Sequence, residues 1–168
     1  SDNQRCLKEI QEAYGKIVRT EKNICLYNKV KFDYSEELFN LNMNIVLQNI
    51  QYGESIRLLW ASRLDNDKNL QLLLDFSVSY PEIYIDIYGE SLFNNAELLI
   101  IQLFELPNIC YCGRFNNIQQ ILSSEFKYFA FMFTSYWEGL PNILLEVGLL
   151  GLPIIAPDVG GVNELINI

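Results

Sequence analysis

The stretch that decides the fold runs from Ile56 to Ser79 and reads IRLLWASRLDNDKNLQLLLDFSVS. Its first part, Ile56–Ala61, is a short apolar run, typical of a strand that is buried on both faces of a parallel sheet. Its last part, Asn69–Ser79, carries apolar residues at helical spacing. The residues between them are polar and charged, which predicts a loop. A strand, a loop and a helix in this order form the first half of a βαβ unit.

The same alternation continues to the end of the chain. Further strands are predicted at Ile83–Tyr88, Asn108–Cys112, Tyr128–Thr134 and Pro153–Ala156, and further helices at Asn95–Leu103, Ile118–Leu122, Asn142–Leu149 and Val162–Ile166. Strict alternation predicts an α/β fold with a doubly wound, Rossmann-like parallel sheet. Ligands of such sheets bind beyond the carboxyl ends of the strands.

The residues before this pattern behave differently. We predict a helix at Asn3–Tyr14 and a strand at Ile24–Tyr27, and we assign no element to the polar, Asn-rich stretch Asp33–Glu54. The chain therefore divides into residues 1–54, a linker with a helix and a strand that packs on the domain, and residues 55–168, the Rossmann-like domain. Because the chain stops inside a helical pattern at Ile168, we expect this domain to be incomplete at its C-terminus and part of a longer enzyme.

Composition narrows the function. The chain has 168 residues, half of them apolar, which suits one compact domain. Twelve Lys and Arg face 21 Asp and Glu, giving a formal net charge of −9. Such a chain does not attract a phosphate backbone over a broad surface, so we expect no nucleic-acid partner.

The absence of histidine from the sequence excludes Ser-His-Asp and Cys-His relays and every His-ligated metal site. The four cysteines lack C-x-x-C pairs, and Cys110 and Cys112 share one face of their predicted strand. We interpret them as reduced, buried, structural thiols. These patterns indicate no zinc or redox motif, and we expect no metal site and no bound cofactor.

Two segments of the sequence indicate where in the cell the protein is located. Residues 1–10 are polar and charged, unlike a signal peptide. The longest apolar stretch, Ile143–Ala156, contains Glu146 and Pro153 and is shorter than the ~20 residues of a membrane span. We expect a cytoplasmic protein whose membrane association, if any, comes from segments outside this chain.

The most informative charged segment is EGLPNILLE, from Glu138 to Glu146. Pro141 suits the first helical turn, where a missing N–H costs nothing, so Glu138 belongs to a loop and Glu146 to a helix. Backbone amides from Gly139 through Asn142 to Ile143, at the positive end of the helix dipole, offer a seat for a phosphate, a sugar hydroxyl or a carboxylate.

A second charged segment follows the first predicted strand. Arg63 and Lys68 lie in the loop Ser62–Asn69. The planar fork of arginine and the point charge of lysine together suit neighbouring phosphates.

In order and spacing, these motifs resemble the C-terminal, donor-binding half of group 1 (family 4) retaining glycosyltransferases of the GT-B fold. That family has two glutamates separated by seven residues, here Glu138 and Glu146, and a basic pair after the first strand, here Arg63 and Lys68. Its closing loop reads here GLPIIAPDVGGVNE, from Gly151 to Glu164. The resemblance covers Ile56 to Ile166.

The resemblance implies a role for each motif. Arg63 and Lys68 would hold the diphosphate of a UDP- or GDP-linked sugar without a metal. Glu146 would accept hydrogen bonds from the ribose, and Glu138, with the amides of Gly139 and Leu140, would face the donor sugar. The turn containing Gly113 and Arg114 would hold the nucleobase. The implied reaction is transfer of the sugar to an acceptor with retention.

The chain departs from the family pattern at Ser62, where glycine is common, and at Gly89-Glu90-Ser91, which replaces a glycine-rich turn. The N-terminal, acceptor-binding domain of such enzymes is not in this chain, so we expect the chain alone to bind donor weakly and to catalyse little.

Alternative interpretations stay open at this point. Glu138 is also compatible with a purely structural role, in which its charge complements the helix dipole. Arg63 and Lys68 are also compatible with ordinary surface cations that bind no ligand. The whole domain is compatible with a non-catalytic interaction or regulatory nucleotide-binding module, or with a related epimerase. A phosphorylase is disfavoured, because no lysine for pyridoxal phosphate follows Lys127.

Overall fold

The computed structural model describes residues 8, 12, 35–93, 95–124 and 128–165. In chain order the elements are α2 (Glu36–Tyr52), β1 (Arg57–Ala61), the 3-10 helix η2 (Asn66–Lys68), α3 (Leu70–Ser79), β2 (Tyr84–Tyr88), α4 (Glu97–Phe104), β3 (Ile109–Gly113), α5 (Ile118–Ser124), β4 (Ala130–Met132), α6 (Asn142–Leu149), β5 (Ile154–Ile155) and α7 (Val162–Leu165). The predicted helix Asn3–Tyr14, apart from Lys8 and Glu12, and the predicted strand Ile24–Tyr27 lie outside the described residues.

The five described strands form one parallel sheet in the order β3-β2-β1-β4-β5. Leu59 at the centre of β1 pairs with Asp86 of β2 on one side and with Phe131 of β4 on the other. The order shows that the chain winds outward from β1 to β3 and then returns past β1 to β4. This arrangement confirms the predicted α/β, doubly wound fold.

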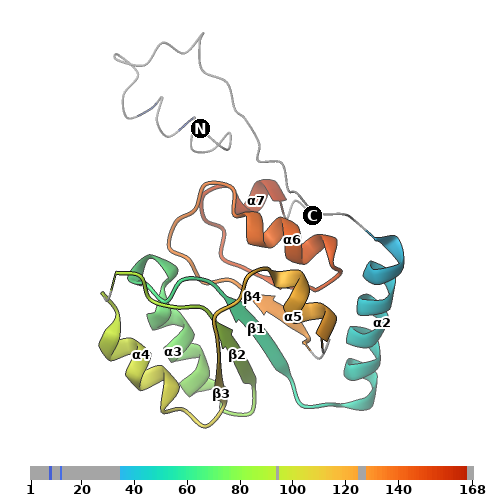
Figure 1. Ribbon diagram of the computed structural model, residues 1–168, viewed down its shortest axis with the longest axis horizontal. Helices are drawn as coiled ribbons and strands as arrows, with labels where there is room; N and C mark the ends of the chain where they lie inside the picture. Colours follow the sequence, from blue (N-terminus) through green and yellow to red (C-terminus); the bar gives the residue numbers. More distant parts are fainter. Residues whose placement is uncertain (1–7, 9–11, 13–34, 94, 125–127, 166–168) are drawn as a thin grey trace.

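Helices cover both faces of the sheet (Figure 1). On one face, Leu58 and Trp60 of β1 pack with Leu70 and Leu73 of α3 and with Leu103 of α4. On the other face, residues of α2, α5 and α6 pack against the alternate strand residues, which include Leu59 and Phe131. Each central strand is therefore buried on both faces, as its continuous apolar sequence predicted.

The predicted elements from Ile56 onward are confirmed, with small shifts at their ends. The largest shift is in β4, which is two residues shorter at each end than the predicted Tyr128–Thr134. Pro141 was predicted in the first helical turn, but it is the N-cap residue of α6, with φ −73° and ψ 109°, and the helix begins at Asn142.

Helix α2 lies in the stretch to which the sequence interpretation assigned no element. Ser35 caps its start by accepting a hydrogen bond from Leu38 N, and Gly53 ends it in the left-handed region. The helix carries many apolar residues, yet only Asn42 and Val46 are buried. Asn42 Nδ2 donates to Leu150 O (2.7 Å), which ties α2 to the end of α6.

The cysteine prediction is partly wrong. Cys110 is exposed and Cys112 is half-buried, because both side chains lie on the edge strand β3. Both are free thiols, as predicted.

No helix among the described residues has the length and apolar character that crossing a membrane requires.

Candidate functional site

The site lies where the winding direction of the sheet reverses. The chain leaves β1 toward β2 on one side, whereas β4 lies on the other side of β1. Loops at such a switch point diverge and leave a crevice beyond the carboxyl ends of the strands. Here the loop after β1 carries Arg63 and Lys68, and the loop after β4 carries Glu138.

Asp65 organises the loop after β1. Its side chain is fully buried, and its Oδ1 accepts from Ser91 Oγ (3.2 Å) and from the backbone N–H groups of Leu92 and Phe93 (3.3 Å each). Its Oδ2, which has no hydrogen-bond partner, lies 3.4 Å from a guanidinium nitrogen of Arg63. Asp65 therefore joins the loop after β2 to the arginine of the loop after β1.

Lys68 is held from two strands. Its carbonyl oxygen accepts from Thr134 Oγ1 (2.6 Å), and Thr134 in turn accepts from the indole N–H of Trp60 (3.0 Å). The Lys68 ammonium contacts the Glu138 carboxylate, to which Ser135 Oγ also donates (3.1 Å). These contacts place a lysine and a glutamate that are 70 positions apart against each other.

Asp67 bridges the two cations. Its Oδ2 lies 2.8 Å from an Arg63 nitrogen and 3.4 Å from Lys68 Nζ, and its side chain is half exposed. The cluster has two positive and three negative groups, because Asp65 and Glu138 add to Asp67. An incoming anion would compete with these carboxylates for the two cations, and Asp67 is the most exposed of the three.

Glycines allow the backbone of the closing loop to approach the site. A Cβ on Gly160 would lie 1.6 Å from Glu138 O, and its φ is +52°. Gly161 N also donates to Gly139 O (2.8 Å). Only glycine fits where the loop before α7 crosses the loop before α6, so the Gly-Gly pair supports the position of Glu138.

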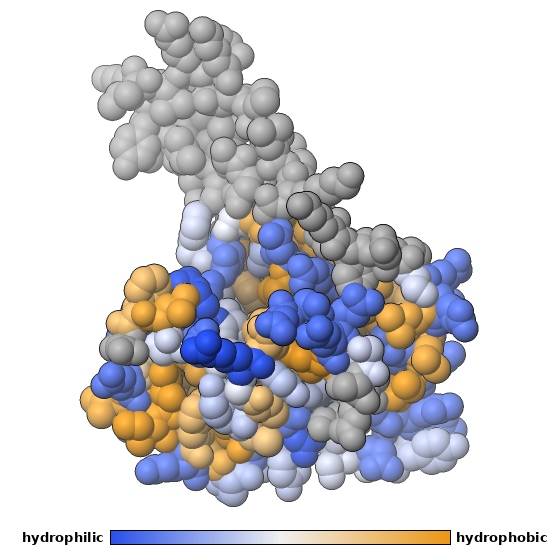
Figure 2. Space-filling view, in the orientation of Figure 1, coloured by the Kyte–Doolittle hydropathy of each residue, from blue (hydrophilic) through white to orange (hydrophobic). Residues whose placement is uncertain are grey.

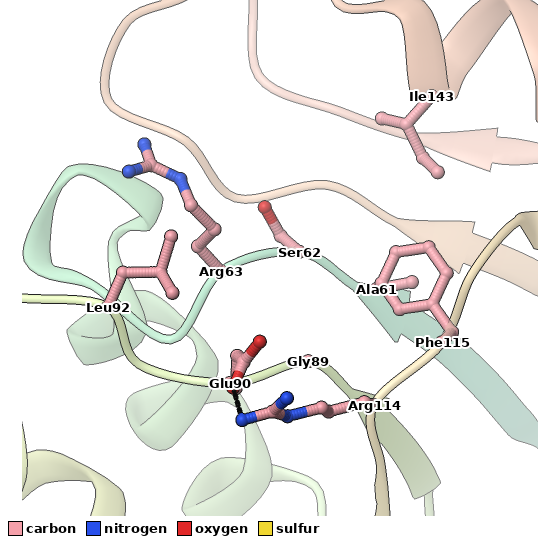
Figure 3. Close-up of a pocket in the computed structure, with 9 residues that line it drawn as sticks. All are labelled: Ala61, Ser62, Arg63, Gly89, Glu90, Leu92, Arg114, Phe115 and Ile143. Carbon is pink, nitrogen blue, oxygen red and sulfur yellow. Dashed lines mark ion pairs between the residues drawn. The ribbon is translucent and has the colours of Figure 1, made fainter.

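A cavity of about 350 Å³ opens beside the charged cluster (Figure 3). Arg63 and Leu92 lie at one end, and Phe115 and Ile143 lie at the other. Along one edge, Arg114 forms an ion pair with Glu90. The cavity has the size of a small-molecule site, with charged groups at its rim and apolar groups at one end.

In Figure 2, hydrophilic residues cross the centre of this face, whereas apolar surface covers α4, where Leu98 and Ile101 are exposed.

Glu146 lies one turn after Ile143 on α6, so the two side chains share a helix face. Burial raises the pKa of the Glu146 carboxyl group above its ordinary value. Within the described part of the chain, its carboxylate has no ion-pair partner. Its carboxylate is partly desolvated, but Glu146 itself does not line the cavity.

The structure brings most of the sequence-predicted residues to this edge of the sheet. Arg63, Lys68 and Glu138 are in one cluster, and Arg114 lines the cavity. Gly113, the last residue of β3, directly precedes Arg114 and has a φ of +83°. Three predicted residues lie around the start of α6: Gly139 and Leu140 are buried behind Glu138, and Asn142 is exposed at the first helical position.

Sequence reasoning missed several residues of the site, among them Asp65, Asp67, Glu90 and Phe115. Asp65 and Asp67 alternate with the predicted cations in the same loop, and Glu90 and Phe115 each follow a predicted strand closely. Their position at strand ends was the available signal.

A parallel α/β sheet with Arg63, Lys68 and Glu138 gathered at its switch point is the arrangement that the sequence resemblance led us to expect. The model of the family "Glycosyl transferases group 1" matches residues 46–167. The chain belongs to this family.

Curated relatives agree. An uncharacterized glycosyltransferase of Methanocaldococcus jannaschii is 26% identical over 90% of this chain and 37% of its own length. The O-antigen biosynthesis glycosyltransferase WbnH of Escherichia coli is 32% identical over 66% of this chain and 31% of its own length. This chain therefore spans about a third of the curated relatives it matches.

Solved structures share the fold. Anabaena HepE in complex with UDP-glucose superimposes with a TM-score of 0.72 at 22% identity, covering 99% of this chain and 46% of that one. The lipopolysaccharide glycosyltransferase WaaG superimposes with a TM-score of 0.62 at 16% identity, covering 96% of this chain and 44% of that one.

Proposed function

We propose that this chain is the donor-binding part of an enzyme that transfers a sugar, with retention, from a nucleoside diphosphate to an acceptor. The observation that carries the proposal is the meeting of Arg63, Lys68 and Glu138 at the switch point, beside a cavity of about 350 Å³. Cations at that place suit a diphosphate, and the glutamate suits the hydroxyls of the attached sugar.

Each residue has a distinct task in this proposal. Arg63 and Lys68 bind the diphosphate in place of Asp67 and stabilise the charge that develops on it as the sugar leaves. Glu138, held by Lys68 and Ser135, accepts hydrogen bonds from the sugar. Glu146 accepts them from the ribose, because both oxygens of a carboxylate are acceptors. The nucleobase lies toward Arg114 and Phe115.

Uridine diphosphate is the nucleotide to test first. The titles of the HepE structures name UDP and UDP-glucose, and that of the pneumococcal GtfA structure names UDP and GlcNAc. Guanosine diphosphate is the matched alternative from the sequence-based prediction. The acceptor site belongs, in this proposal, to an N-terminal domain outside this chain. Cytoplasmic location and a metal-free donor site stay predictions of the sequence.

The test is calorimetric titration of the chain with UDP and GDP. We expect binding in the micromolar to millimolar range, weakened about tenfold or more by Arg63→Ala or Lys68→Ala, since each removes a charge-assisted contact. Lys8→Ala is the matched control, because it removes an exposed lysine that pairs with Glu12. The proposal fails if neither nucleotide binds at millimolar concentration, or if all three variants bind like the unmodified chain.

A further inference from the structure

Two cysteines lie together on the edge of the sheet, on the face away from α4. Their neighbours on β3 point toward α4: Ile109 packs in that core, and the Tyr111 ring stacks on Phe104 with centroids 4.6 Å apart. Because strand residues alternate, Cys110 and Cys112 point to the other face. Neither cysteine lines the cavity of the proposed donor site.

The two sulfur atoms are 3.8 Å apart. Two thiolates bound to one tetrahedral zinc ion, at about 2.3 Å each, are separated by about 3.8 Å. A carboxylate oxygen of Asp86, on the neighbouring strand β2, lies within 4.8 Å of both sulfur atoms. The structure thus assembles two sulfur ligands and one oxygen ligand from adjacent strands.

An irregularity in the sheet places Cys112. The pairing of β2 with β3 passes from Ile87 with Tyr111 to Tyr88 with Gly113, so Cys112 has no partner in the ladder. Such a bulge re-aims a side chain at the edge of a sheet. Residues two apart on a strand are separated by about 6.6 Å, so the 3.8 Å between the sulfur atoms requires the two side chains to lean together.

Neighbouring side chains orient the carboxylate of Asp86, as they do for carboxylates that bind metal ions. Arg57 binds its Oδ1, and the Tyr128 hydroxyl donates to its Oδ2 (3.0 Å). Outer contacts of this kind orient a ligand and are part of most metal sites. Two thiolates, one carboxylate, the Arg57 guanidinium and a divalent cation sum to zero charge, so the filled site carries no net charge on a partly buried surface.

A disulfide fits this pair less well. The separation of about 6.6 Å between alternate residues is near the upper limit of the Cα separations that disulfides span.

We propose that Cys110, Cys112 and Asp86 bind a thiophilic divalent cation of the zinc class. On binding, each thiol releases its proton to solvent and forms a sulfur–metal bond. No electron is transferred, and a water molecule completes four-coordination on the exposed side of Cys110. The site joins β2 to β3 immediately before the turn that carries Gly113 and Arg114.

The test is a titration of the reduced, metal-free chain with Cd²⁺, followed by the ultraviolet charge-transfer absorption of cadmium thiolates. We expect saturation at one ion per chain and displacement of Cd²⁺ by excess Zn²⁺. Cys110→Ser and Cys112→Ser should each abolish the saturable band, and Asp86→Asn should weaken binding about 10- to 100-fold. A variant with both Cys6→Ser and Cys25→Ser is the matched control and should keep the band.

Circular dichroism of each variant separates loss of ligand from loss of fold. Cys110 is exposed, so its replacement by serine tests the proposal even if Asp86→Asn does not fold. The proposal is overturned if the unmodified chain shows no saturable band, if a folded Cys110→Ser, Cys112→Ser double variant keeps it, or if mass spectrometry finds the two cysteines joined in a disulfide in the non-reduced protein.

Discussion

The ammonium group of Lys68 contacts the carboxylate of Glu138, which joins the 3-10 helix after β1 to the loop before α6. The two side chains are largely buried, 12% and 23% exposed, so each partly depends on the other for its solvation. This contact couples the two loops that the sheet brings together at its switch point.

Lys68→Ala should therefore destabilise the domain. It leaves Glu138 with Ser135 and without its cation, and we expect a loss of about 1–2 kcal/mol in the free energy of unfolding, less than for a fully buried pair. Urea denaturation measures the loss. Adding Glu138→Gln to Lys68→Ala should recover part of it, because the uncompensated charge is then absent. Strict additivity of the two substitutions would show that the pair is not coupled.

Gly160→Ala should damage both the fold and the site. Its Cβ would lie 1.6 Å from Glu138 O, and the residue has a φ of +52°, so backbone strain and overlap together should cost about 2 kcal/mol or more. We also expect loss of UDP binding, because Glu138 must move.

Gly53→Ala is the matched control for Gly160→Ala. Gly53 has a φ of +66° with nothing within 4 Å of the added Cβ, so only the backbone strain of about 1 kcal/mol applies. Thermal denaturation compares the two variants. Equal effects would mean that the approach of Gly160 to Glu138 is not tight.

The sequence predicted the sheet well because its strands are buried on both faces. A run such as Leu58–Ala61 must be apolar at every position, and this pattern needs no knowledge of its neighbours. Helix α2 was not predictable in the same way. Its buried positions are Asn42 and Val46, while Leu41, Leu47 and Ile50 are exposed, so its apolar residues do not mark the face that packs.

The residues of the site also differ in how far the sequence alone could predict them. Arg63 and Lys68 were recognisable as charged residues at the end of a strand. The roles of Asp65 and Asp67 depend on contacts from other loops: Asp65 accepts from the backbone N–H groups of Leu92 and Phe93, and the Asp67 carbonyl accepts from Tyr136 N (3.1 Å). No local pattern encodes which loops meet, so these two carboxylates required the tertiary structure.

Glu146→Gln should stabilise the domain while it weakens nucleotide binding. Burial raises the folded-state pKa of this carboxyl above its ordinary value of 4.5, so the protonated form is favoured on folding. That stability is fully present below 4.5 and is lost as the pH rises through the folded-state pKa. Glutamine resembles the protonated form at every pH.

At neutral pH, the denaturation midpoint of Glu146→Gln should therefore exceed that of the unmodified chain, and the difference should vanish in acid. UDP affinity should fall, because one oxygen acceptor becomes an N–H donor. Denaturation series at several pH values, paired with calorimetry, check both results. A midpoint difference that persists in acid would contradict the desolvation argument.

Asp67→Asn should strengthen diphosphate binding. Asp67 lies 2.8 Å from an Arg63 nitrogen and 3.4 Å from Lys68 Nζ, and its side chain is half exposed, so it occupies the cations where a phosphate would bind. An exposed ion pair is worth little, which makes the competition modest, and we expect UDP affinity to rise about 1.5- to 5-fold at low salt. The gain should shrink as the salt concentration rises, because screening weakens both the competitor and the ligand.

Asp75→Asn is the matched control for Asp67→Asn. It changes the net charge by the same amount as Asp67→Asn. Asp75, however, is an exposed residue of α3 whose Oδ1 accepts a hydrogen bond from Gln71 Nε2 (2.8 Å). UDP affinity should therefore stay near that of the unmodified chain. If Asp67→Asn instead weakens UDP binding while Asp75→Asn does not, Asp67 positions the two cations for the ligand, because its orienting effect on Arg63 and Lys68 would then exceed its repulsion of the diphosphate.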